Sequence, residues 1–171
     1  VVGLGKVDNE LVNDARLIIA NDNFDNSEFH LAKKDYQLIS NQTQSEFGAE
    51  AKYQLAFLAF LESDYKKSEK IIFELVENYF SDFFIAKSFI LLADIYKEKN
   101  NLFQSKATLQ SIIDNYDGDD LREISLNKIS EIDSLNEKSL MNTKNDELII
   151  NLLNDVELSE LFEEENTLED E

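Results

Sequence analysis

The sequence predicts an all-α protein made of stacked helical hairpins, and three observations lead to this prediction. Its 171 residues include no proline and only four glycines, so the residues that interrupt helices are almost absent. Apolar side chains recur three and four positions apart, which is the spacing of one helix face and not the alternation of a strand. A common pattern of residues also returns after about 37 positions, which is typical of repeat architectures.

Three copies of this pattern follow one another in the chain. The second copy begins near Ala49 and ends at Tyr79, and the third runs from Ala86 to Tyr116. A fainter first copy lies about 36 residues upstream of the second. Three copies at one period indicate a repeated structural unit and not a chance similarity.

Each copy is predicted to form two antiparallel helices. A small residue in the first helix is followed, twelve positions later, by another small residue in the second helix, which would let the helices approach closely. Segments rich in Asn, Asp and Ser at residues 22–27, 62–64 and 99–101 should end one helix and cap the next. The small residues are the pairs Ala20 and Ala32, Ala56 and Ser68, and Ala93 and Ser105.

The remaining elements are assigned in chain order. Residues 1–9 are interpreted as the end of a preceding repeat or as a linker, so the chain is expected to be part of a longer protein. The hairpin stack should occupy residues 10–133, with a capping helix from about residue 119 whose apolar face covers the end of the stack. We expect a linker at residues 134–145, an amphipathic helix at residues 146–162 and an acidic disordered tail at residues 163–171.

The repeats resemble the tetratricopeptide repeat (TPR) over roughly residues 10–117. The resemblance implies a right-handed solenoid of about three helical hairpins plus the capping helix. Two departures are Phe80 and Asp117, which stand where the family usually closes a repeat with proline. The residues that carry the resemblance are Leu55, Ala56, Asp64, Tyr65, Ser68, Ile72 and Leu75, with Leu92, Ala93, Tyr96, Ser105, Leu109 and Ile112.

Residues 48–53 and 86–96 are similar in particular to the C-terminal repeats of large TPR proteins of Bacteroidetes cell envelopes. This similarity implies a periplasmic or cell-envelope location, and a cytoplasmic location is the alternative. The absence of cysteine is compatible with both compartments.

TPR modules bind partners on the inner face of their first helices, so the resemblance implies a concave protein-binding groove. The middle hairpin would place three aromatic residues in a row there, as anchors for a peptide or helix. The alternative is that these rings pack on neighbouring helices or on the tail. A clamp for a C-terminal carboxylate is not expected, because only Asn21 fits its pattern. The predicted groove residues are Leu17, Asn21, Phe24, Tyr53, Phe57, Phe60, Ile90, Asp94 and Lys97.

The amphipathic segment 146–162 has two interpretations. It either folds back in cis on the end of the stack or on the groove, or it docks on a partner protein. A membrane-surface helix is disfavoured, because its polar face carries acidic residues and no Lys or Arg.

Charge and composition exclude further classes of function. The formal net charge of −20, with 16 scattered basic residues, disfavours nucleic-acid binding, and no apolar run is long enough for membrane insertion. Half of this charge lies in residues 136–171, which carry twelve acidic and two basic side chains. With no cysteine and the single histidine His30, no metal site or cofactor is expected.

No nucleophile elbow, phosphate loop or metalloprotease motif occurs, so the chain is not expected to be an enzyme. The sequence therefore predicts a protein-protein interaction scaffold that binds a peptide or helix. The alternative is a structural C-terminal piece that caps and solubilises a longer solenoid and has no binding site of its own.

Overall fold

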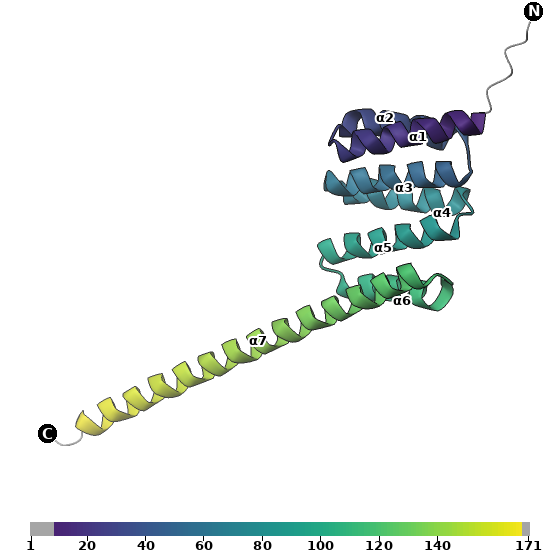
Figure 1. Cartoon of the computed structure of the whole chain (residues 1–171). Helices are drawn as coiled ribbons and strands as arrows, with labels where there is room; N and C mark the ends of the chain where they lie inside the picture. The colour runs from purple at the N-terminus through teal and green to yellow at the C-terminus, as the bar shows by residue number, and fades with distance from the viewer. Residues whose placement is uncertain (1–8, 169–171) are drawn as a thin grey trace, which may run out of the picture. The chain divides into compact units, whose positions relative to one another are not determined.

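The protein is all-α in the part of the chain that the structure describes, residues 9–168. The computed structural model contains seven α-helices and no strand within this range (Figure 1). The predicted fold class is thereby confirmed at the level of helical content. The helices are α1 (Asn9–Asp25), α2 (Phe29–Gln42), α3 (Glu46–Leu61), α4 (Tyr65–Asn78), α5 (Asp82–Glu98), α6 (Leu102–Asn115) and α7 (Asp119–Leu168).

The chain divides into two compact units, Val1–Ile129 and Ser130–Glu171. The first unit contains α1 to α6 and the beginning of α7. Consecutive helices in this unit pack as the neighbouring pairs α1 with α2, α3 with α4, and α5 with α6. Helix α3 also contacts both α1 and α2, and α5 contacts both α3 and α4, so each hairpin lies directly on the one before it (Figure 1).

The small residues spaced twelve apart lie at the centre of each hairpin, as the sequence predicts. All six are at most 1% exposed. The Ser68 hydroxyl donates a hydrogen bond of 2.8 Å to the carbonyl of Ala56, and the Ser105 hydroxyl donates an equal bond to the carbonyl of Ala93. The first hairpin has Ala32 in this position, so close approach of the helices is common to all three hairpins, whereas the hydrogen bond is confined to the last two.

The turns of the second and third hairpins follow the expected capping chemistry, whereas Glu28 at the start of α2 makes no side-chain cap. Asp64 and Asn101 cap the second helix of their hairpins by accepting from the backbone N–H groups of Lys67 and Gln104. In the first hairpin the turn is shorter than expected, because α1 continues to Asp25. One residue in each of the three turns has a positive φ of 57° to 63°; these are Ser27, Ser63 and Asn100.

The C-terminal elements differ from the sequence prediction. Residues 134–145 were expected to be a linker, but they lie within helix α7, which is continuous to Leu168 and therefore includes most of the tail expected to be disordered. A physical reason is that no proline or glycine follows Gly118, so a polar composition alone does not stop the helix. The side chains of Leu148, Ile149 and Ile150 in the predicted amphipathic segment are exposed. Residues 1–8 and 169–171 lie outside the described part of the chain.

Substitution of Ser68 tests how closely α3 and α4 must pack. Ser68→Ala should lower the free energy of unfolding by only about 1 kcal/mol, because it loses one hydrogen bond and Ala32 occupies the equivalent place in the first hairpin. Ser68→Leu should cost about 2 to 4 kcal/mol, because the larger side chain must separate the two helices. Urea unfolding followed by circular dichroism measures both values.

Ser134→Leu is the matched control, because Ser134 is exposed on a helix. Its effect should stay within about 0.5 kcal/mol. Equal effects of Ser68→Leu and Ser134→Leu would contradict the close-packing argument.

Candidate functional site

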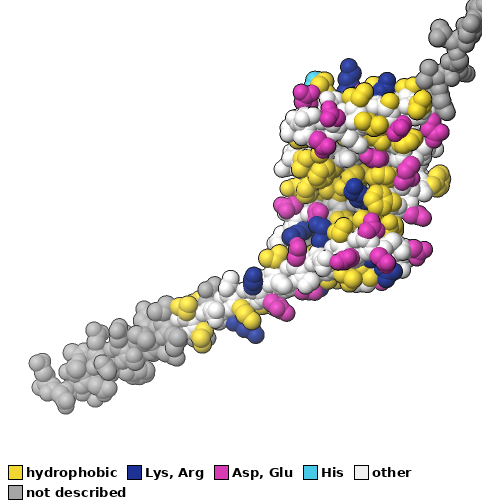
Figure 2. Space-filling view, viewed as in Figure 1, with side chains coloured by type: hydrophobic (Ala, Val, Ile, Leu, Met, Phe, Trp, Pro, Cys, Tyr) yellow, Lys and Arg dark blue, Asp and Glu magenta, His cyan; other side chains and the backbone are white. Residues whose placement is uncertain are grey.

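The predicted groove residues come from α1, α3 and α5, which lie side by side in the first unit. Each of these helices is the first helix of its hairpin, so equivalent positions in the repeats face the same way. Figure 2 shows hydrophobic side chains gathered over the middle of the hairpins, with basic side chains among them. This surface is the candidate site.

An unbroken series of aromatic contacts crosses the site from α1 to α5. Phe57 lies at the centre, with its ring centroid 5.9 Å from Phe24, 6.3 Å from Tyr53 and 6.4 Å from Phe60. Tyr53 continues the series to Phe84 on α5, at 6.1 Å. These separations fall within the range in which aromatic rings attract one another, about 4.5 to 7 Å. The rings pack against one another. Phe84 is buried, whereas the other four rings remain only partly buried.

Four of the predicted residues line one cavity of about 300 Å³. Asn21 and Phe24 contribute from α1, and Tyr53 and Phe57 contribute from α3. The structure therefore brings together two of the three helices at the positions selected from the sequence. The other lining residues are Asp25, Gln54 and Lys87.

Lys87 supplies the positive charge at this site. Its ammonium nitrogen lies 4.7 Å from the ring centroid of Tyr53, 5.6 Å from that of Phe83 and 5.8 Å from that of Phe84. Such placement over ring faces is a cation-π arrangement, which stabilises the ammonium group at a partly exposed site by about 0.5 to 1 kcal/mol. The cavity is therefore lined by three aromatic rings and one cation, with the Asp25 carboxylate and the amides of Asn21 and Gln54 beside them.

Asn21 is held in place by hydrogen bonds at both ends of its amide. Its oxygen accepts a bond of 2.7 Å from the Tyr36 hydroxyl, and its nitrogen donates a bond of 3.0 Å to the Glu50 carboxylate. Burial, followed by the charges of Glu50 and Asp25, raises the pKa of Tyr36, so its hydroxyl keeps its proton and remains a donor. The amide thus presents a fixed edge to the cavity.

The other five predicted groove residues do not line this cavity. Leu17 and Ile90 are core residues, exposed by only 5% and 8%, so they pack inside the hairpin stack. Asp94 accepts a hydrogen bond of 2.7 Å from the Lys128 ammonium group. Phe60 packs against Tyr65 at 5.6 Å, and Lys97 is partly exposed.

Sequence reasoning missed Lys87, and the repeat itself contains the signal that could have found it. The predicted groove residues begin at Tyr53 in the second hairpin and at Ile90 in the third. One helical turn earlier, the equivalent positions are Glu50 and Lys87. Extending the predicted groove by that turn would have added Glu50, which accepts a hydrogen bond from Asn21, and Lys87, the cation of the cavity.

Within the described residues, no group of three or more His, Cys, Asp or Glu side chains is arranged to hold a metal ion. None of the helices in residues 9–168 combines the length and apolar content that a membrane span requires. Neither a protein-family model nor a curated protein matches this chain.

Ionisation of Tyr53 should link stability to alkaline pH. Burial, together with the nearby Asp94 carboxylate, raises the pKa of Tyr53 to about 12, against about 10 in the unfolded chain. The folded state then holds a proton that the unfolded state releases. This contribution is complete below about pH 10 and is lost as the pH rises through about 12.

Urea unfolding of the chain and of Tyr53→Phe at about pH 8, 10 and 11.5 measures this contribution. The free energy of unfolding should fall with pH in both proteins, because the pKa of Tyr36 is also raised. The fall should be smaller in Tyr53→Phe. An equal fall in the two proteins would show that Tyr53 does not carry the effect.

Proposed function

We propose that this chain is a non-enzymatic interaction scaffold of the TPR type, which binds a peptide or helix across α1, α3 and α5. The observation that carries the proposal is the partly buried aromatic series with Lys87 among its rings. The repeat of about 37 residues and the packing of successive hairpins support a solenoid. A right-handed stack closed by the start of α7 is the arrangement that we propose.

The lining chemistry favours a peptide over a polar metabolite. Phe24, Tyr53 and Phe57 offer apolar faces, and large aromatic residues are the common anchors of protein interfaces. Lys87 and the Asn21 amide then add a cation and a polar edge beside these faces. The partner that fits is a segment with an apolar side chain for the cavity and a carbonyl or carboxylate near Lys87.

The same lining supports a role without catalysis. It offers two amides, aromatic rings, one amine and one carboxylate, without a nucleophile placed against a base. The raised pKa of Tyr53 keeps its hydroxyl protonated at neutral pH, which suits a contact residue better than a base.

The location that we propose is the periplasm or another part of the cell envelope, and its support is the resemblance of the repeats. A cytoplasmic location is the alternative. The structural function, capping and solubilising a longer solenoid, is the second candidate because residues 136–171 carry twelve acidic and two basic side chains.

Peptides selected from a random library on the intact chain allow a direct test. Their affinities for the intact chain and for Phe57→Ala should be measured by fluorescence anisotropy. We expect Phe57→Ala to weaken most selected peptides by about 30-fold, because it removes the ring that contacts three others. Lys87→Glu should weaken peptides that carry a carboxylate and leaves the ring series in place.

Phe103→Ala is the matched control, because Phe103 is 84% exposed on α6 and lies outside the site. It should bind the selected peptides as the intact chain does. Circular dichroism of each variant identifies any loss of fold. Unchanged affinity in folded Phe57→Ala, or equal losses in Phe57→Ala and Phe103→Ala, would contradict binding at this surface.

A further inference from the structure

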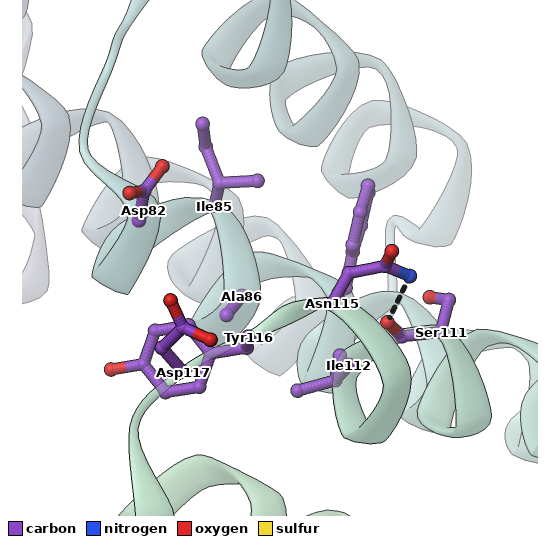
Figure 3. A pocket seen from close by; sticks show the side chains of 9 residues that line it. Asp82, Ile85, Ala86, Ser111, Ile112, Asn115, Tyr116 and Asp117 are labelled. Atoms are coloured by element: carbon purple, nitrogen blue, oxygen red, sulfur yellow. Dashed lines mark hydrogen bonds between the residues drawn. The ribbon is translucent and has the colours of Figure 1, made fainter.

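A second cavity, of about 390 Å³, lies between the beginning of α5 and the end of α6. Figure 3 shows the side chains that line it. None of these residues belongs to the aromatic site. Ile85, Ala86, Phe89 and Ile112 make its apolar part. The polar residues that complete the lining are Asp82, Ser111, Asn115, Tyr116 and Asp117.

The preceding hairpin shows why this cavity exists. There, Tyr79 is buried at 5% exposure in a cluster with Ala49 and Leu75, and its hydroxyl donates a bond of 2.8 Å to the Ser40 carbonyl. Gly48 makes room for this ring. A side chain at Gly48 would collide with a backbone carbonyl and would come within 3.0 Å of Tyr79.

The third hairpin lacks that arrangement. The equivalents of Gly48 and Tyr79, 37 positions on, are Ile85 and Tyr116. Tyr116 turns instead toward Gly118, against which its ring packs so closely that a side chain there would collide with it. The place that a tyrosine ring fills in the second hairpin is therefore open in the third.

A second exchange removes a polar bridge from the same place. In the second hairpin Lys52 and Glu74 join α3 to α4 through an ion pair of 2.7 Å. Their equivalents are Phe89 and Ser111, which both line the cavity. The exchange replaces a charged bridge by one apolar ring and one short hydroxyl, so this place is more apolar in the third hairpin than in the second.

The rim of the cavity is acidic. Asp82 and Asp117 are exposed, and no Lys or Arg lines the cavity. The Ser111 hydroxyl and the Asn115 amide nitrogen are already engaged, since they donate to backbone carbonyls at 2.7 and 2.8 Å. The groups that remain available to bind a ligand are consequently the apolar residues at the bottom of the cavity and the two carboxylates at its edge.

We propose that this cavity binds the side chain of an arginine or lysine from a partner peptide. The methylene stem of such a side chain covers the apolar residues, and its charged head reaches the carboxylates of Asp82 and Asp117. The volume lies in the range of ligand sites, about 300 to 1,000 Å³, and exceeds what one basic side chain needs, so part of the neighbouring peptide backbone enters as well.

The test uses the intact chain labelled at its isoleucine methyl groups and the probe acetyl-Gly-Gly-Arg-Gly-Gly-amide. Nuclear magnetic resonance titration at about 20 mM salt, where surface charges are weakly screened, should show saturable shifts of the Ile85 and Ile112 methyl signals. A peptide with Lys in place of Arg should give the same shifts. Peptides with Met, Tyr or Glu at that place should give at least about threefold weaker binding.

Two variants test whether the rim carboxylates and the empty volume of the cavity are needed for peptide binding. Asp82→Asn with Asp117→Asn should weaken the Arg peptide at least about threefold, whereas Asp114→Asn, an equal change of charge at an exposed α6 residue outside the lining, should not. Ile85→Gly restores the arrangement around Gly48, so Tyr116 should enter the cavity. The Ile112 methyl signal should then move upfield, and Arg peptide binding should be lost.

The proposal is overturned if the Arg peptide leaves the Ile85 and Ile112 signals unchanged, or if the Met or Tyr peptide binds as tightly as the Arg peptide. Equal weakening by Asp114→Asn and by the double substitution would also overturn it, because the rim would then act only through net charge. Full retention of Arg peptide binding in folded Ile85→Gly would also overturn the proposal, because it would show that the peptide binds outside this cavity.

Discussion

The close contact of two helices at one pair of small residues is the constraint on which the rest of this structure depends. Ala56 and Ser68 are fully buried, each against the other's helix. The serine hydroxyl donates its hydrogen bond to the backbone carbonyl of Ala56. No side-chain volume remains at that point, so the helices can pack only with these faces together. The outer faces of α3 are thereby left for α1 and α5, which is why aromatic residues from successive hairpins meet.

Much of this arrangement could be read from the sequence, because it depends on local spacing. The hairpins, their small-residue pairs and the capping role of Asp64 follow from period and residue type alone. Burial is harder to read from spacing: Leu17 and Ile90 lie on the predicted helical face, yet neighbouring helices cover them. The continuation of α7 through residues 134–145 was not predicted, because polar composition indicates solvent exposure and exposure does not end a helix.

The cavities were beyond sequence reasoning because they depend on which way a ring turns. Tyr79 and Tyr116 are equivalent in the repeat, yet one is packed inside and the other turns toward Gly118. The difference arises from the exchange of Gly48 for Ile85, and it becomes visible only when both environments are compared. Divergence between repeats has thus produced two surfaces of opposite character, one with a cation among aromatic rings and one with carboxylates around an apolar floor.

The twelve-residue separation of the small residues also has a consequence for folding kinetics. Each hairpin closes its central contact across a short loop, so the entropy lost before the first favourable contact is small. Chains dominated by such local contacts fold quickly, and repeat units can nucleate independently before docking on their neighbours. In the second and third hairpins the serine hydroxyl adds a hydrogen bond at this point of closure.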